Sequence, residues 1–129
     1  MLIGKLSDAT GVNIETIRYY ERVGLISAPP RTAGGHRAYD EQHAQRLIFI
    51  RRGRELGFSL DDIRSLLELA SRTNLACAET KEITLRQLSG VRGKIESLKK
   101  LELALDKMSD ACKPGTNEPC PIFDALSSP

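Results

Sequence analysis

A stretch of about 34 residues, 78–111, constrains the fold most, because it reads as one long uninterrupted helix. Helices of globular proteins usually run roughly 8–20 residues, so a longer one needs a second helix along its apolar face. Apolar residues recur here at steps of three and four, the pattern of a coiled-coil seam with one shift of register. We therefore predict a homodimer joined by a coiled coil. The seam consists of Leu88, Val91, Ile95, Leu98, Leu101, Leu105, Met108 and Cys112.

The three cysteines of the chain lie at the two ends of this helix. Cys77 comes just before it, Cys112 just after it, and Cys120 closes a C-x₇-C loop. At a rise of ~1.5 Å per residue the helix spans on the order of 50 Å, so Cys77 cannot share a ligand with the loop of its own chain. Antiparallel pairing would instead bring Cys77 of one chain to the loop of the other. This geometry predicts two intersubunit sites of three thiolates each, which select soft metals, although three buried packing cysteines are the alternative.

The beginning of the chain has the pattern of a helix-turn-helix. A first helix over Ile3–Thr10 ends at Gly11, and Asn13 is a good N-cap for a second helix, about Ile14–Val23. Two short helices joined by a tight turn that contains glycine are typical of this DNA-binding motif. The segment Arg31–Tyr39 follows, with Gly34-Gly35 predicted as a two-residue hairpin turn of a basic wing.

The remaining elements are also predicted to be helical. Asp40 caps a third helix that runs to about Leu56, and Ser59 caps a fourth. The predicted class is therefore mostly α: a winged helix-turn-helix head, a long antiparallel coiled-coil dimerisation helix, and a short metal-binding loop and helix. The expected domains are 1–70 for the DNA-binding head, 71–111 for the linker and dimerisation helix, and 112–129 for the metal-binding end.

The distribution of charge indicates a nucleic-acid partner for the first half. Residues 1–54 hold nine Lys/Arg and five Asp/Glu, a net charge of +4, whereas the rest of the chain has a net charge of −2. No apolar run approaches the ~18 residues that a membrane span needs, and the start lacks the features of a signal peptide. We expect a cytoplasmic protein with no membrane partner and reduced cysteines.

No catalytic constellation is evident. His36 lies in the expected wing and His43 in the third helix, where we interpret both as surface or backbone contacts. The sequence has no phosphate-cradling glycine loop and no nucleophile–base pair. We therefore expect no enzyme activity. From the second helix, Thr16, Arg18 and Tyr19 offer groups for base edges and phosphates, whereas Tyr20 is predicted to be core.

The first 70 residues closely resemble the MerR family of transcription activators. The resemblance rests on ETIRYYERVGL at 15–25, GGHRAYDEQHAQRLIFI at 34–50 and RELGFSLDDIRSLL at 54–67. It implies a homodimer on palindromic promoter DNA that represses without metal, and activates with metal by distorting the DNA for RNA polymerase. The implied DNA contacts are Arg18 and Tyr19 on phosphates, Arg31, Gly35, Arg37 and Tyr39 in the wing, and Arg54 as a further backbone contact.

The cysteine trio resembles the metal-sensing branch of the family. Family members that sense monovalent ions carry serine where this chain has Cys77, and a third thiolate suits a divalent ion. Zinc prefers four ligands, and the loop adds no histidine or further cysteine. Hg(II) is the favoured effector, by similarity to the mercuric resistance regulators, with Cd(II), Pb(II) and Zn(II) as alternatives. A heavy-metal resistance or efflux operon is the expected target. A thiol redox sensor with a Cys112–Cys120 disulfide is the other alternative.

Overall fold

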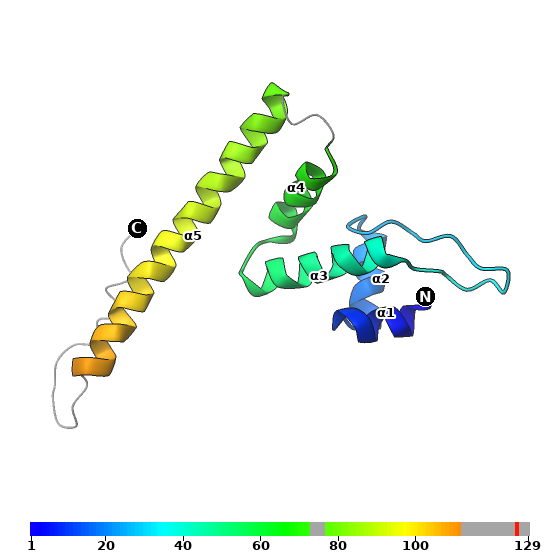
Figure 1. Ribbon diagram of the computed structural model, residues 1–129, viewed down its shortest axis with the longest axis horizontal. Helices are drawn as coiled ribbons and strands as arrows, with labels where there is room; N and C mark the ends of the chain where they lie inside the picture. Colours follow the sequence, from blue (N-terminus) through cyan, green and yellow to red (C-terminus); the bar gives the residue numbers. More distant parts are fainter. Residues whose placement is uncertain (73–76, 112–125, 127–129) are drawn as a thin grey trace. The chain divides into compact units, whose positions relative to one another are not determined.

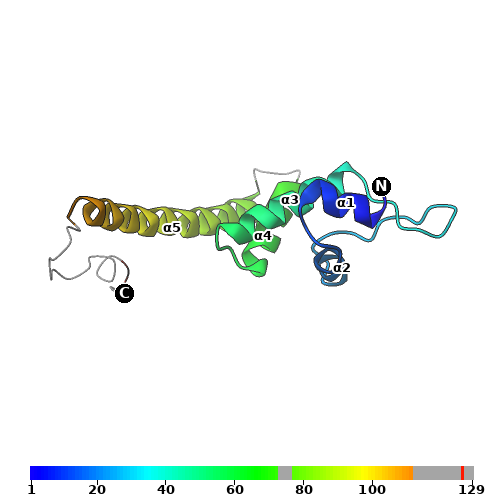
Figure 2. The ribbon, with the colours of Figure 1, turned by 90° about the horizontal axis from the view of Figure 1, so that it is seen from below.

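The computed structural model describes residues 1–72, 77–111 and 126 (Figures 1 and 2). The expected metal-binding end, 112–129, with Cys112, Cys120 and its short helix, lies outside these residues, apart from Leu126. The chain forms two compact units, Met1–Thr73 and Asn74–Pro129. In the described residues no helix is long and apolar enough to cross a membrane. The helices in these residues are α1 (Ile3–Thr10), α2 (Ile14–Arg22), α3 (Glu41–Glu55), α4 (Leu60–Ser71) and α5 (Ala78–Ala111).

The helix-turn-helix forms at the residues where the sequence predicted it. Helix α1 ends at Gly11, whose φ of 72° is in the left-handed region and whose N–H donates to the Ser7 carbonyl. Helix α2 begins after Asn13, whose side-chain oxygen accepts from the Thr16 N–H at 2.8 Å. Ile17 and Tyr20 are buried and hold α2 against the core of the head, as expected for Tyr20. Local capping chemistry therefore determines both ends of the turn.

Helices α3 and α4 complete the head, and both begin at the predicted caps. Asp40 accepts from the His43 N–H, and the His43 ring accepts from the Asp40 N–H, which makes a capping box. The Ser59 hydroxyl accepts from the Asp62 N–H at 3.1 Å. The sequence predicts that His43 is a surface or backbone contact. It is not a surface residue, since its side chain is buried and serves the cap of α3.

The wing is a loop closed by one antiparallel bridge, Arg31 to Arg37. Figure 1 shows it as an extended excursion between α2 and α3. The Gly35 N–H donates to the Thr32 carbonyl at 2.9 Å, and Gly35 has a φ of 81°. The predicted two-residue turn at Gly34-Gly35 is wrong, because such a turn commonly needs positive φ at both central residues and Gly34 lacks it. The turn is instead centred one residue earlier, on Ala33-Gly34, and Gly35 is the residue with left-handed backbone that follows it.

Gly53 of α3 lies against Ile63 of α4 with no room for a side chain of its own. A Cβ at this position would lie 3.1 Å from both Cγ1 and Cδ1 of Ile63, which is fully buried. In a helix, alanine should stabilise over glycine by about 1 kcal/mol, but overpacking a filled core costs about 1–3 kcal/mol. We expect Gly53→Ala to lower the free energy of unfolding by about 1 kcal/mol, measured by chemical denaturation at fixed protein concentration.

The matched control for this prediction is Gly4→Ala. Gly4 is also helical, and a Cβ there meets nothing within 4 Å. This change should leave stability unchanged or raise it by up to about 1 kcal/mol. Equal stabilisation by the two substitutions would show that Ile63 moves freely and that the α3–α4 packing is loose.

Helix α5 runs without interruption over 34 residues, as the sequence predicted. Several seam side chains are exposed on the single chain, which leaves large apolar surface along the helix. Large apolar side chains left exposed at coiled-coil spacing along one helix indicate a surface for a partner helix. The exposed seam residues are Leu88, Ile95, Leu98 and Leu105.

Candidate DNA-binding face and effector cysteine

Helix α2 presents a polar and aromatic face to solvent. Arg18 is exposed, and the Tyr19 side chain is 40% exposed. The Arg22 guanidinium lies 5.5 Å from the centroid of the Tyr19 ring, a cation–π contact that limits the orientations of both groups. Thr16 is half-buried near the start of the helix, where its backbone N–H is used by the Asn13 cap. Arg18 and Tyr19 are thus available to a partner at this surface.

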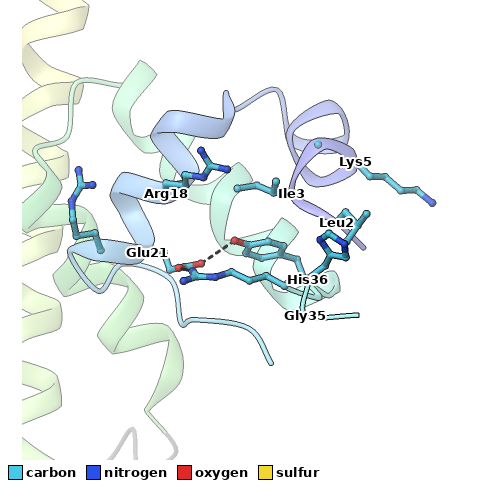
Figure 3. Close-up of a pocket in the computed structure, with 11 residues that line it drawn as sticks. Leu2, Ile3, Lys5, Arg18, Glu21, Gly35 and His36 are labelled. Atoms are coloured by element: carbon cyan, nitrogen blue, oxygen red, sulfur yellow. Dashed lines mark hydrogen bonds and ion pairs between the residues drawn. The ribbon is translucent and has the colours of Figure 1, made fainter. Parts of the chain in front are cut away.

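A basic hollow of about 930 Å³ lies beside this helix in the head. It is formed by the start of the chain, α1, α2 and the wing, as Figure 3 shows. Lys5, Arg18, Arg22 and Arg37 bring positive charge to its lining, and Glu21 is the acidic residue of the lining. A concave surface with this excess of cations can hold phosphate groups. Among the site residues predicted from sequence, this hollow brings together Arg18, Gly35, Arg37 and Tyr39.

The other predicted DNA contacts lie outside the lining of the hollow. Thr16 and Tyr19 are on α2, and Arg31 is exposed in the wing, where its guanidinium donates to the Gly35 carbonyl at 3.0 Å. Arg54 is exposed at the end of α3 and donates to the Phe58 carbonyl at 3.0 Å. These contacts orient both arginines and leave further donors of each guanidinium available.

Glu21 joins α2, the second helix of the helix-turn-helix and hence its recognition helix, to the wing. The sequence did not predict this role. The Tyr39 hydroxyl donates to Glu21 Oε1 at 2.9 Å, and the Arg37 guanidinium pairs with Glu21 Oε2. Tyr39 is 3% exposed, so its side chain faces the core and Glu21 in this structure and not the surface. The i to i+3 spacing of Arg18 and Glu21 could have indicated that they share one face of the helix. No local sequence pattern indicated that the partners of Glu21 come from the wing.

Backbone and ring contacts hold Tyr39 itself. Its N–H donates to the Met1 carbonyl at 2.7 Å, and its ring meets the His43 ring edge to face, with centroids 5.3 Å apart. The hydrogen bond from the His43 N–H holds the pKa of the neighbouring Asp40 carboxyl below its usual value. Asp40 therefore stays ionised as a cap in mild acid, and its contribution to stability is lost only as the pH falls through that lowered pKa.

Two arginines from α3 and α4 bind the end of α2 and the turn that follows it. Arg64 donates to the carbonyl of Val23, the C-cap of α2, at 2.8 Å, and Arg46 donates to the Leu25 carbonyl in the turn at 3.0 and 3.3 Å. Cations are favourable at this end of a helix, where carbonyls lack intrahelical partners. The orientation of α2 is thus tied to both later helices of the head.

Cys77 is the predicted metal ligand that the structure describes. Its carbonyl accepts from the Lys81 N–H at 3.1 Å, so Cys77 is the N-cap residue of α5, and it is half-buried. Helix N-termini favour negative charge, which suits a thiolate ligand. Within residues 1–72 and 77–111, no three His, Cys, Asp or Glu side chains cluster as a metal site.

Comparison with known proteins identifies the family. The family model for the MerR HTH family regulatory protein matches residues 1–70, and the model described as "MerR, DNA binding" matches residues 44–108. The chain belongs to the MerR family. It is therefore a DNA-binding transcription regulator and not an enzyme, as the sequence predicted. MerR regulators bind promoter DNA as homodimers, which accounts for the exposed seam of α5.

Relatives and solved structures of the MerR family match nearly the whole chain. A mercuric resistance operon regulatory protein of Bacillus cereus is 42% identical over 125 residues, 96% of this chain and 95% of that protein. Heavy metal-dependent transcription regulator 2 of Rhizobium meliloti is 33% identical over 128 residues, 99% of this chain and 87% of that protein. The crystal structure of PbrR691 from Ralstonia metallidurans in complex with lead(II) is 39% identical. It covers 98% of both chains with a TM-score of 0.58.

Proposed function

We propose that this MerR-family protein is a metal-responsive regulator of a heavy-metal resistance or efflux operon, and that its effector is Hg(II). The 42% identity to the mercuric resistance regulator of Bacillus cereus supports mercury, and the lead(II) complex of PbrR691 supports Pb(II) as the next candidate. Cd(II) and Zn(II) also bind thiolate ligands and are therefore further candidate effectors. The protein acts in the cytoplasm, where its thiols stay reduced.

The observation that carries the proposal is the unbroken helix between the cysteines. Thirty-four helical residues separate Cys77 from Cys112, which corresponds to ~50 Å at the usual rise. The eight residues from Cys112 to Cys120 extend at most about 29 Å, so neither loop cysteine reaches Cys77 within one chain. In an antiparallel dimer, Cys77 of one protomer meets Cys112 and Cys120 of the partner subunit.

The donor set fits a soft divalent ion. Three thiolates bind strongly to thiol-seeking metals, and low coordination numbers suit Hg(II) better than Zn(II), which prefers four ligands. Each metal displaces thiol protons, so affinity should rise with pH. The direct test is native mass spectrometry of the reduced dimer against Hg(II), Cd(II), Pb(II), Zn(II) and Cu(I), with competing thiol present. Two Hg(II) per dimer at the lowest free metal supports the proposal, and preferential retention of another ion overturns the mercury assignment.

The proposed mechanism is a change of DNA shape. Two heads, one from each protomer, sit on the half-sites of a palindromic promoter. Without metal the dimer represses, and metal at the ends of the coiled coil reorients the heads. The DNA is then bent and undertwisted so that RNA polymerase can use both promoter elements. Such a deformation costs a few kcal/mol, which metal–thiolate ligation can supply.

The head binds DNA mainly through phosphates. Arg18 and Tyr19 of the recognition helix and Arg31 and Arg37 of the wing offer donors to the backbone, and Thr16 is the candidate for a base edge. Gly35 has no side chain, so the wing can approach the DNA backbone closely, and Arg54 adds a backbone contact from α3. Tyr39 supports the wing through the hydrogen bond from its hydroxyl to Glu21.

Arg18→Ala and Arg37→Ala test these contacts. Each should weaken DNA binding by a similar amount on every sequence and reduce the slope of log affinity against log salt by about one unit. Fluorescence anisotropy across a series of salt concentrations measures both quantities. An unchanged affinity and slope for either variant would remove that arginine from the phosphate contacts.

A further inference from the structure

We propose that Glu21 is a positioning residue that clamps the wing to the recognition helix and aims Arg37 at the DNA backbone. This inference rests on the proposed DNA-binding face and adds an acidic residue to it. Glu21 lies in the lining of the basic hollow, where a carboxylate by itself repels phosphate. The hydrogen-bond and ion-pair partners of Glu21 explain why a carboxylate lies in this hollow.

Both carboxylate oxygens of Glu21 are used, and both partners come from the wing. Oε1 accepts from the Tyr39 hydroxyl at 2.9 Å, and Oε2 pairs with the Arg37 guanidinium. The Glu21 side chain is only 11% exposed. A carboxylate this shielded from water needs such partners, and charged hydrogen bonds of this kind are among the stronger ones.

The two ends of the clamp are held by different kinds of contact. On one side, α2 is held in the core by Ile17 and Tyr20 and at its C-terminal end by arginine contacts. On the other side, the wing is closed by the bridge between Arg31 and Arg37 and by backbone hydrogen bonds within the loop, and the buried Tyr39 anchors its end to the core. Through its ion pair with Arg37, Glu21 adds a side-chain link from the helix to the part of the wing that precedes Tyr39.

Arg37 can keep this ion pair and still bind a phosphate. Its side chain is 41% exposed, and one of its terminal nitrogens, Nη1, faces Glu21. A guanidinium carries five N–H donors in a rigid fork, so the other nitrogens remain available. Holding the fork in place before DNA arrives removes part of the rotamer entropy that a free arginine would lose on binding. Arg18 and Arg37 thus reach the same hollow from two elements that Glu21 joins.

The direction in which Glu21→Gln changes DNA affinity distinguishes a positioning role from a purely electrostatic one. Glu21→Gln removes a negative charge from a DNA-facing hollow, so charge alone predicts tighter binding. Loss of the clamp predicts weaker binding, because Arg37 loses its charged partner while glutamine can still accept from the Tyr39 hydroxyl. The matched control is Glu15→Gln, which removes the same charge from an exposed position on the same helix.

The experiment measures DNA affinity of the full-length dimer by fluorescence anisotropy, with a duplex that the wild type has selected from a random library. We expect Glu21→Gln to weaken binding roughly tenfold and to flatten the salt slope, and Glu15→Gln to leave binding equal or tighter. In an Arg37→Ala background, Glu21→Gln should have little further effect, because the two residues act as one unit. Thermal unfolding of each variant checks that the head remains folded.

A second variant tests the clamp while Glu21 remains in place. Arg37→Lys keeps the positive charge but lacks the fork that serves a carboxylate and a phosphate together, so it should also weaken binding. Binding of Glu21→Gln at or above wild-type affinity, or the same tenfold loss in the Arg37→Ala background, overturns the inference. A wild-type chain that binds no duplex overturns the proposed function as well, so the two failures are distinguishable.

Discussion

Cys77→Ser homodimers and Cys112→Ser homodimers each lose the response to metal, and a heterodimer with one copy of each variant regains about half of it. The reason is the length of α5, which keeps Cys77 and Cys112 of one chain ~50 Å apart. In the heterodimer, the wild-type Cys77 of one protomer faces the wild-type loop of the other, so one complete three-thiolate site remains. The second site lacks ligands on both sides.

The measurement combines metal stoichiometry with transcription. Affinity tags of two kinds isolate the heterodimer, native mass spectrometry counts bound Hg(II), and a promoter–reporter titration follows the response. We expect one Hg(II) per heterodimer against two for the wild type. A dimer isolated with the same two tags that carries Cys77→Ser in both protomers is the control and should lose most of its response to Hg(II). A verified mixed heterodimer that binds no Hg(II) would sink the intersubunit site.

Loss of Cys77 alone should change which ions the protein binds. With three thiolates the site favours a divalent ion, and with two it becomes relatively better suited to linear coordination of a monovalent ion. We expect Cys77→Ser to lose most of its Hg(II) response, by at least about tenfold in the effective concentration, because one of three soft ligands is gone. Cu(I) or Ag(I) binding at Cys112 and Cys120 should survive.

The same variant should keep its affinity for DNA. Cys77 is the N-cap of α5 and belongs to a different compact unit from the helix-turn-helix. A gel-shift assay without metal checks this, alongside reporter titrations of wild type and variant with each ion under strong reductant. Retained response under reductant also argues against a disulfide switch. An unchanged Hg(II) response would instead assign sensing to the two loop cysteines and leave Cys77 a structural role.

Local chemistry made much of the fold predictable. The left-handed Gly11, the Asn13 cap and the Asp40 cap each act within four residues of the helix end that they define, so the sequence alone places these ends. The long helix was predictable because its period extends over 34 residues. The wing turn was misplaced by one residue, since two adjacent glycines leave open which of them takes the positive φ.

The sequence by itself determined the helices, the family and the candidate ligands and DNA contacts, because capping, periodicity and motif spacing are local properties of the chain. Tertiary structure alone decided how the DNA-binding face is assembled. Tyr39 turns toward the core, Glu21 receives two wing residues, and Arg64 reaches the Val23 carbonyl from 41 positions away. These partners meet only after the head has buried its core, so no local sequence pattern predicts their contacts. The carboxylate of Glu21, which by itself would repel phosphate, acquires its role from such distant partners.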